Sequence, residues 1–389
     1  MRDDNEAKND RTNSEGLTEN LTENLTENLT DNLTTQQTRR NRKQRVIRYL
    51  ILVMGVLIVA AVFLVYYIKS NIDDMIIPHN IVVDSESEIN REVDAAPIPD
   101  EEDPDLYFLI MGLDYRGEHN ALLTDSLMIL HIIPQIETVK LLSIPRDLLV
   151  ENTSGHSVKI NALFSEGYTL YKKKAEQDPS ILTGDTIQLG TKTLDKAVLS
   201  GAIANTRGKL EELLDIDIDN TVLVNFNTVV SLVDEIGGIE IDVKRSMKYR
   251  PTNLYLEPGL QVLMGEDALG YARFREDDRG SRYFASDFER GKQQQEVVKA
   301  LAEQIFSWQN SGKVLTLLKI VSENIQTDMD YSTMYSMITK YYNVFNSHSF
   351  LSVPFPEHYS QDGDVVIPED ALSNLQRAFK SVQIEQSVE

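Results

Sequence analysis

The sequence contains no cysteine. This absence excludes disulfide bonds, thiolate zinc sites and a cysteine nucleophile, and it is compatible with an extracytoplasmic location. The six histidines are scattered, and no pair has a metal-ligand spacing such as H-E-x-x-H. The nucleophile pattern G-x-S-x-G is also absent, so the sequence gives no support to covalent acyl chemistry.

Positive charge is scarce. The 389 residues include 38 Lys and Arg against 61 Asp and Glu, which gives a net charge of −23. This balance argues against a nucleic-acid partner, because nothing offsets repulsion from a phosphate backbone. Any anion site must therefore be a local arginine cluster within an acidic protein. The hydrophobic fraction of 41% is ordinary for a globular domain.

Only one long run lacks charge, Tyr49–Ile68. Its length suits one transmembrane helix. A basic cluster precedes it and a mainly acidic stretch follows, which predicts a cytoplasmic N-terminus by the positive-inside rule. A cleaved signal peptide is the alternative, but residues 1–38 ahead of the run disfavour it. The basic residues are Arg39, Arg40, Arg42, Lys43, Arg45 and Arg48.

These features divide the chain into four parts. Residues 1–38, with LTEN repeats, are predicted to be a disordered cytoplasmic tail. Residues 39–69 form the basic flank and signal anchor, and residues 70–105 an acidic, proline-containing linker. Residues 106–389 form the extracytoplasmic domain.

Helical and strand patterns alternate through residues 106–389, which predicts a single α/β domain with α-β-α layers and a central mixed sheet. A polar surface insertion is expected at 172–190, and Gly201 and Gly208 are expected to interrupt the helix at 191–214. The predicted strands are 107–111, 127–133, 139–144, 221–226, 239–243 and 350–355. The predicted helices are 191–214, 227–236, 265–272, 286–308, 313–325 and 331–345, a short one near 159–167 and a last one from 368.

Charged residues flank the first three strands. Asp114 follows the first, Asp125 precedes the second and Arg146 follows the third. Ligands in α/β proteins collect beyond strand ends, so two carboxylates and an arginine there can hold a divalent cation and a phosphate. The alternative is that these are ordinary loop charges.

A second charged stretch lies far downstream. Arg273 and Arg275 would point about 200° apart on a continuous helix, so they can serve one anion only if the helix ends near Ala272. Arg290 and Gln294 share a helix face. Guanidinium groups match phosphate oxygens. The alternative is a salt-bridge network with the nearby acids Glu266, Asp267, Asp277, Asp278 and Asp287.

Seven motifs are weak signals one by one, but together and in this order they are specific for one protein family. The pieces are FLIMGLD (108–114), LTDSLMIL (123–130), LLSIPRD (141–147), KINALFSEG (159–167), VNFNTVVSLVDEIGGIEIDV (224–243), GLQVLMGEDALGYARFR (259–275) and DFERGKQQQEVVKAL (287–301). Their order and content, over residues 106–305, resemble the LytR–CpsA–Psr family of membrane-anchored cell-wall enzymes.

The resemblance implies a phosphotransferase on the outer face of the bacterial cytoplasmic membrane. Such enzymes move an anionic glycopolymer from a polyprenyl-pyrophosphate carrier onto peptidoglycan. By position, Asp114 and Asp125 match the family's aspartates for Mg2+ and catalysis, and the general base stays open between them. The matches to its pyrophosphate-binding residues are Arg146, which is also implied in catalysis, Arg273, Arg275, Arg290 and Gln294.

Two positions depart from the family pattern. Leu123 and Gln293 stand where many members have arginine. They motivate an alternative function, a pyrophosphatase or a non-catalytic wall-associated regulator that binds polyprenyl pyrophosphate. A structural wall-binding protein is the third hypothesis.

Overall fold

The computed structural model describes residues 75–77, 104–113, 122–189, 192–305, 313–339, 341, 344–345, 349–360 and 364–382. The predicted tail, the predicted transmembrane run, most of the predicted linker and Asp114 lie outside these residues. Contacts group residues 1–69 and residues 70–389 into separate units, and all of the described residues belong to the second. Among them, no helix has both the length and the apolar character that a membrane crossing requires.

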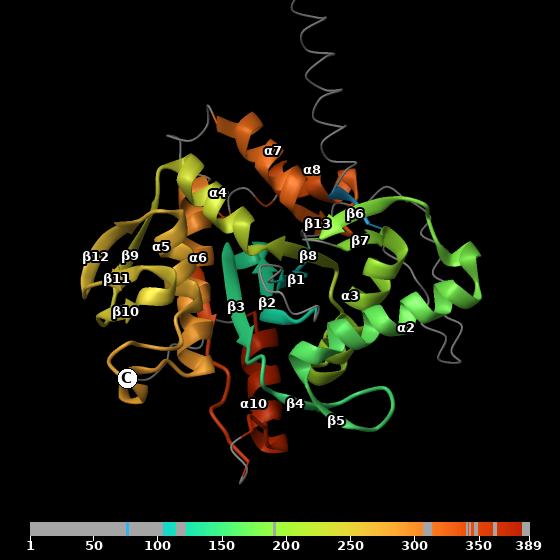
Figure 1. Ribbon diagram of the computed structural model, residues 1–389, viewed down its shortest axis with the longest axis horizontal. Helices are drawn as coiled ribbons and strands as arrows, with labels where there is room; N and C mark the ends of the chain where they lie inside the picture. The colour runs from blue at the N-terminus through green and yellow to red at the C-terminus, as the bar shows by residue number, and fades with distance from the viewer. Residues whose placement is uncertain are drawn as a thin grey trace, which may run out of the picture. The chain divides into compact units, whose positions relative to one another are not determined.

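A six-stranded mixed sheet lies at the centre of the domain (Figure 1). β1 pairs with β8 and β3 with β14 in parallel, whereas the remaining neighbours are antiparallel. The predicted mixed sheet is therefore confirmed. In spatial order the strands are β13 (Ile325–Thr327), β8 (Asn220–Asn225), β1 (Leu106–Leu113), β2 (Thr124–Ile133), β3 (Thr138–Ile144) and β14 (Phe350–Val353).

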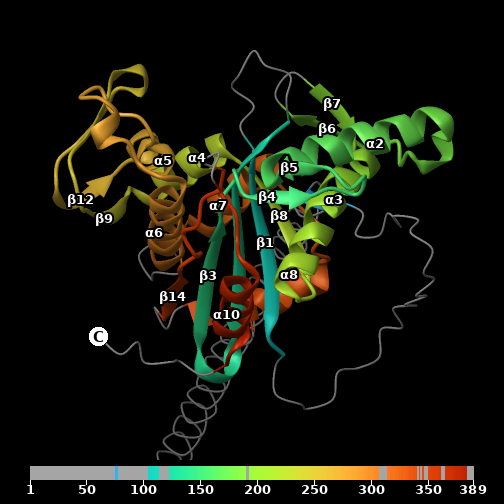
Figure 2. The same cartoon turned by 90° about the horizontal axis from the view of Figure 1, so that it is seen from below.

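Side chains alternate between the two faces of the sheet, and both faces are covered. On β1, Leu109 and Met111 join a core with helices α2, α3 and α10, whereas Phe108 packs on the opposite face. The second face is covered by α6 and α8 (Figure 2). These helices are α2 (Leu163–Gln177), α3 (Lys196–Leu214), α6 (Asp287–Ile305), α8 (Tyr331–Thr339) and α10 (Glu369–Lys380).

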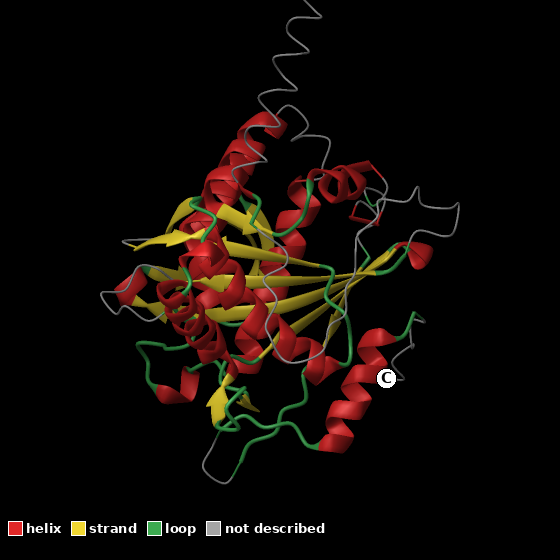
Figure 3. Ribbon diagram, turned by 90° about the vertical axis from the view of Figure 1, so that its right-hand side faces the viewer, coloured by secondary structure: helices red, strands yellow, loops and turns green. Residues whose placement is uncertain are grey.

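A second apolar cluster joins α6 to the remaining helices and to two small sheets. Figure 3 shows helices on both sides of the twisted central sheet. The elements of this second cluster are α4 (Phe226–Ile236), α5 (Gly265–Arg273), α7 (Val314–Asn324), the pair β9 (Ile239–Val243) and β12 (Gly259–Leu263), and the pair β10 (Met247–Tyr249) and β11 (Leu254–Leu256).

Two hairpins complete the described strands. The predicted surface insertion at 172–190 contains the end of α2 and a strand, so it is more regular than expected. The predicted helix at 191–214 begins only at Lys196, because the Asp195 side chain accepts a hydrogen bond from Ala197 N and caps it. The hairpins are β4 (Leu149–Glu151) with β5 (Ser157–Lys159) and β6 (Thr186–Leu189) with β7 (Lys192–Asp195).

Residues 75–77, within the predicted linker, contact the edge of the central sheet. Ile76 forms a parallel bridge with Thr327 of β13, and Ile77 N donates to Thr327 O at 2.8 Å. Ile77 is 2% exposed and belongs to the core that α3 covers. Lys196 Nζ also donates to Ile76 O at 2.9 Å. This short segment is therefore part of the folded domain.

Candidate active site

Six of the seven predicted site residues line one pocket of about 320 Å3, which we call the arginine pocket. They come from the start of β2, the loop after β3, the end of α5 and the first turns of α6. The seventh, Asp114, lies outside the described residues. The six are Asp125, Arg146, Arg273, Arg275, Arg290 and Gln294.

The end of α5 explains how two arginines two positions apart reach the same pocket. The helix ends at Arg273, and Phe274 has the extended angles φ −56° and ψ 122°. Arg275 therefore leaves the helical path, as an anion shared by both arginines requires. Phe274 is buried and anchors this bend, with the Arg245 guanidinium 5.5 Å from its ring centroid.

Asp125 and Arg146 form an ion pair where β2 begins and β3 ends. Arg146 Nη1 donates to Asp125 Oδ1 at 2.8 Å. The Arg146 Nε is buried and makes no hydrogen bond, although Asp147 Oδ2 lies 3.9 Å away. Antiparallel pairing of β2 with β3 brings these two ends together. The Asp125 carboxylate thus holds the Arg146 guanidinium through Nη1 at the wall of the arginine pocket.

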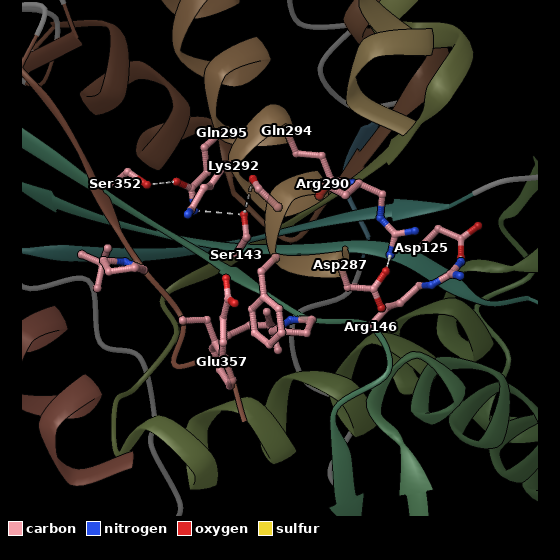
Figure 4. A pocket seen from close by; sticks show the side chains of 17 residues that line it. Asp125, Ser143, Arg146, Asp287, Arg290, Lys292, Gln294, Gln295, Ser352 and Glu357 are labelled. Atoms are coloured by element: carbon pink, nitrogen blue, oxygen red, sulfur yellow. Dashed lines mark hydrogen bonds and ion pairs between the residues drawn. The ribbon is translucent and has the colours of Figure 1, made fainter. Parts of the chain in front are cut away.

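Arg290 belongs to a nearly buried ion pair with Asp287. Their side chains are each 9% exposed, and Arg290 Nη2 lies 2.7 Å from Asp287 Oδ1 (Figure 4). The salt-bridge network considered from the sequence is therefore correct for this pair. It is not correct for Asp277 and Asp278, which pair instead with Arg279 and Arg250. Arg290 lines the arginine pocket as well, so an ion pair and a ligand contact are compatible.

Asp147 and Asp287 form a carboxyl pair that the sequence analysis did not identify as functional. Burial raises the pKa of Asp287, and its hydrogen bond with Asp147 raises it further against the attraction of Arg290. Burial also opposes ionisation of Asp147, yet hydrogen bonds from Asp287 and Lys159 hold the pKa of Asp147 below its ordinary value. The contact therefore moves the two pKa values apart, with that of Asp287 raised and that of Asp147 lowered. The only signal in the sequence is that each aspartate lies next to a predicted arginine motif.

An apolar cavity of about 250 Å3 opens beside the arginine pocket. Phe226, Arg273 and Gln294 line both spaces, and the Arg273 guanidinium lies 4.8 Å from the centroid of the Phe226 ring. The cavity lies between the sheet and helices α4, α5 and α6. Its apolar walls include Ile110, Met128, Val222, Val224, Leu232, Leu269, Val297 and Leu301.

A third space, the polar cavity, measures about 150 Å3 and is drawn in Figure 4. It shares Asp125, Arg146, Arg290 and Gln294 with the arginine pocket. Its other walls come from the end of β3, α6, β14 and the segment after β14. The arginine pocket therefore shares Arg146 and Arg290 with the polar cavity and Arg273 with the apolar cavity, and Gln294 lines all three spaces.

The described part of the chain holds no cluster of three or more His, Asp or Glu side chains able to bind a metal ion. Asp125 supplies carboxylate oxygen at the arginine pocket. Mg2+ is commonly held by one or two carboxylates together with substrate phosphates, so this donor chemistry fits the ion. Leu123 and Gln293, which stand where many family members have arginine, do not line the arginine pocket.

A buried aspartate fixes the segment that follows Arg275. Asp277 accepts hydrogen bonds from Arg279 N at 2.9 Å and from Lys248 N at 3.2 Å. The Arg279 guanidinium holds the pKa of Asp277 at about 2, below its ordinary 3.8. This contact ties the strand β10 to the loop that bears Arg275.

We expect Asp277→Asn to lower stability in a pH-dependent way. A depressed folded-state pKa gives stabilisation that is complete above about pH 3.8 and is lost as pH falls toward 2. The variant should therefore have a lower urea midpoint than the parent at pH 7, and the difference should vanish near pH 2. Asp278→Asn, at the exposed neighbour, is the control. If the urea midpoints of the parent and of Asp277→Asn change with pH in the same way, this assignment is contradicted.

A mixed α/β domain with a cationic pocket opening onto an apolar cavity defines a class of protein suited to an amphiphilic phosphate. The LytR_cpsA_psr family model matches residues 65–381. The chain belongs to this LytR–CpsA–Psr family, and the resemblance seen in its motifs is confirmed.

Two curated relatives are polyisoprenyl-teichoic acid–peptidoglycan teichoic acid transferases. TagV of Bacillus subtilis is 28% identical over 286 residues, which cover 71% of this chain and 63% of TagV, less than two thirds of that relative. TagU of Halalkalibacterium halodurans is 27% identical over 277 residues, 70% of this chain and 77% of TagU.

Solved structures share the fold. The crystal structure of B. subtilis TagV matches with a TM-score of 0.52 and 25% identity, over 72% of this chain and 97% of that chain. Protein gbs0355 of Streptococcus agalactiae matches in fold with a TM-score of 0.53 and 22% identity, over 71% of this chain and 86% of that chain.

Proposed function

We propose that this protein is a phosphotransferase that moves an anionic glycopolymer from a polyprenyl-pyrophosphate carrier onto peptidoglycan. The observation that carries the proposal is the opening of the arginine pocket directly onto the apolar cavity. A lipid pyrophosphate needs these two environments side by side. The relatives named as teichoic acid transferases support the same reaction class.

The donor would place its charged and apolar parts in different spaces. The polyprenyl chain fits the apolar cavity, where burial of hydrocarbon is favourable by about 25 cal/mol per Å2. The pyrophosphate fits the arginine pocket, because guanidinium groups keep their charge and donate in a fork that matches phosphate oxygens. Arg273 lines both spaces and lies at the boundary between them.

The residues around the pocket account for transfer. As the lipid phosphate leaves, negative charge grows on the bridging oxygen and is stabilised by the fixed guanidinium groups of Arg146, Arg273 and Arg290. The acceptor hydroxyl forms the new phosphodiester and gives its proton to a carboxylate. Asp125 and Asp114 are the candidates from the sequence, and Asp125 already lines the pocket.

Mg2+ is the proposed cofactor, held by Asp125 and Asp114. When bound it would neutralise charge on the pyrophosphate oxygens. We expect treatment with EDTA to abolish release of polyprenyl phosphate, and added Mg2+ to restore it. Turnover that persists at full rate in excess chelator would exclude the metal requirement.

Replacing Arg273 or Arg275, at the end of α5, with alanine tests the donor site. We expect Arg273→Ala to lower transfer about 100-fold, as for loss of one transition-state donor, and the more exposed Arg275→Ala about 10-fold. Release of polyprenyl phosphate from a pyrophosphate donor is the measurement. Arg282→Ala, an exposed arginine outside the pocket, is the control. Unchanged turnover in both pocket variants would contradict the proposed function, and retention of lipid without transfer would favour the non-catalytic alternative.

We place this domain on the outer face of the cytoplasmic membrane, with Tyr49–Ile68 as a single anchor and residues 1–38 in the cytoplasm. The charge asymmetry around the apolar run supports this topology. Protease added to intact protoplasts should degrade the domain and spare the tail. Degradation of the tail instead would reverse the assignment.

A further inference from the structure

Helix α6 lies between the apolar cavity and the polar cavity. The residues it presents to the apolar cavity are Gln294, Val297, Val298 and Leu301, which form one stripe along the helix. Those it presents to the polar cavity include Phe288, Gly291, Lys292 and Gln295, together with Asp287, Arg290 and Gln294 near its start. One helix therefore separates two spaces of different chemistry, both of which reach Gln294.

The two cavities lie over different strands of the sheet. The apolar cavity is lined by β8, β1 and β2, whereas the polar cavity is lined by the end of β3 and by β14. Ser143 Oγ donates to Gly291 O of α6 at 3.0 Å, which seats the helix against β3. Asp125, at the start of β2, lines the polar cavity and the arginine pocket but not the apolar cavity. A ligand in each cavity would thus approach the arginines from a different side.

The polar cavity is suited to an uncharged ligand rich in hydroxyl groups. Gln295 Nε2 donates to Ser143 Oγ at 3.1 Å, and Ser352 Oγ donates to Gln295 Oε1, so these polar groups are held in fixed positions. Its ionisable side chains are balanced, with Asp125, Asp287 and Glu357 against Arg146, Arg290 and Lys292. The cavity therefore has no excess charge that would favour an anionic polymer over a neutral sugar.

Phosphoryl transfer places the attacking and leaving oxygens roughly in line across phosphorus. The lipid phosphate leaves toward the apolar cavity, so the acceptor must reach the phosphorus from a different direction. The polar cavity provides one, because it shares Arg146 and Arg290 with the arginine pocket and has its own walls beyond them.

We infer that the polar cavity binds the acceptor sugar of peptidoglycan, an inference that rests on the proposed function. The acceptor hydroxyl oxygen forms a bond to the phosphorus that carries the polymer. The bond from that phosphorus to the lipid phosphate breaks, and the lipid phosphate leaves with the electron pair. The hydroxyl proton passes to the carboxylate of Asp125, which lines both the polar cavity and the arginine pocket.

Filling the cavity tests this assignment. Ser352 is exposed on β14 and, of the three cavities, lines only the polar cavity. Ser352→Phe therefore places a ring in the acceptor space and leaves the pocket arginines unchanged. Ser281→Phe makes the same change at an exposed serine that lines none of the three cavities and is the matched control. The full-length protein in detergent is used, with a polyprenyl-pyrophosphate disaccharide as donor and an uncrosslinked peptidoglycan oligosaccharide as acceptor.

We expect Ser352→Phe to raise the acceptor KM at least tenfold and to leave the donor KM within twofold. Calorimetric binding of the oligosaccharide should weaken in the same proportion, whether or not transfer occurs. An equal effect on the donor, no effect on either substrate, or no oligosaccharide binding by the parent protein would each overturn the inference. If the parent protein binds the oligosaccharide but transfers nothing, and Ser352→Phe abolishes that binding, the subsite is kept and the proposed function is rejected.

Discussion

Replacing Arg290 with alanine is expected to lower glycopolymer transfer about 100- to 1,000-fold, the range typical for loss of one preorganised donor at developing negative charge. Arg290 lines both the arginine pocket and the polar cavity, and it is 7% exposed. A buried cation acts in a lower dielectric than an exposed one, so its loss costs more. Arg290→Lys keeps the charge but not the fork, and should recover only part of the rate.

The same substitution leaves Asp287 buried without its partner, so stability must be separated from activity. Combining Arg290→Met with Asp287→Asn removes both charges and should restore most of the thermal stability. Transfer should stay low in this double variant, as measured by release of polyprenyl phosphate. Recovery of transfer together with stability would mean that Arg290 acts only by holding Asp287.

The second large effect concerns folding. Asp328→Ala is expected to cost about 3–5 kcal/mol in the free energy of unfolding, as for removal of one partner from a buried ion pair. The Asp328 side chain is 2% exposed, and its Oδ2 accepts from Arg207 Nη1 at 3.0 Å. Its Oδ1 accepts from Thr221 N at 2.6 Å. The carboxylate thus joins α3 to two strands of the sheet.

Urea unfolding of the full-length protein measures this cost. Glu212→Ala is the control, because Glu212 is exposed, pairs with Lys209 on the same helix α3 and is expected to contribute less than about 1 kcal/mol. A loss below about 1 kcal/mol for Asp328→Ala would show that the pair is not an important support of this sheet edge.

Local patterns predicted most of the central sheet, including the edge strand β14, but not the edge strand β13. The first three predicted strands form the neighbours β1, β2 and β3, because each is an apolar run long enough to show its period. Ile325–Thr327 was included in part in the helix predicted at 313–325, yet it forms β13. Three residues carry no period, and pairing with β8 decides their conformation.

Packing between helices also explains why Gly201 lies inside a helix. Gly201 and Gly208 were both expected to interrupt a helix, but α3 continues through both. A Cβ at Gly201 would lie 2.1 Å from the Tyr171 ring of α2, so the glycine allows close contact between the two helices. Only the neighbouring helix reveals this, and the sequence around Gly201 does not.

The predictions for the site divide in the same way, into those that local spacing supports and those that need tertiary contacts. Spacing alone predicted that Arg273 and Arg275 can share a ligand only where the helix ends, and the helix does end there. Spacing could not predict that these two arginines lie beside Arg146, which comes more than a hundred residues earlier. The family resemblance supplied that link. The carboxyl pair of Asp147 and Asp287 depends on tertiary contact and was missed.

The contact of residues 75–77 with β13 determines where a trimmed version of the domain can begin. A start near residue 104, which the linker composition suggests, would remove Ile77 from the core and leave the outer edge of β13 unpaired. Unpaired strand edges promote association between chains. A soluble fragment for crystallisation or enzymology is therefore best begun before Met75, so that the edge stays covered.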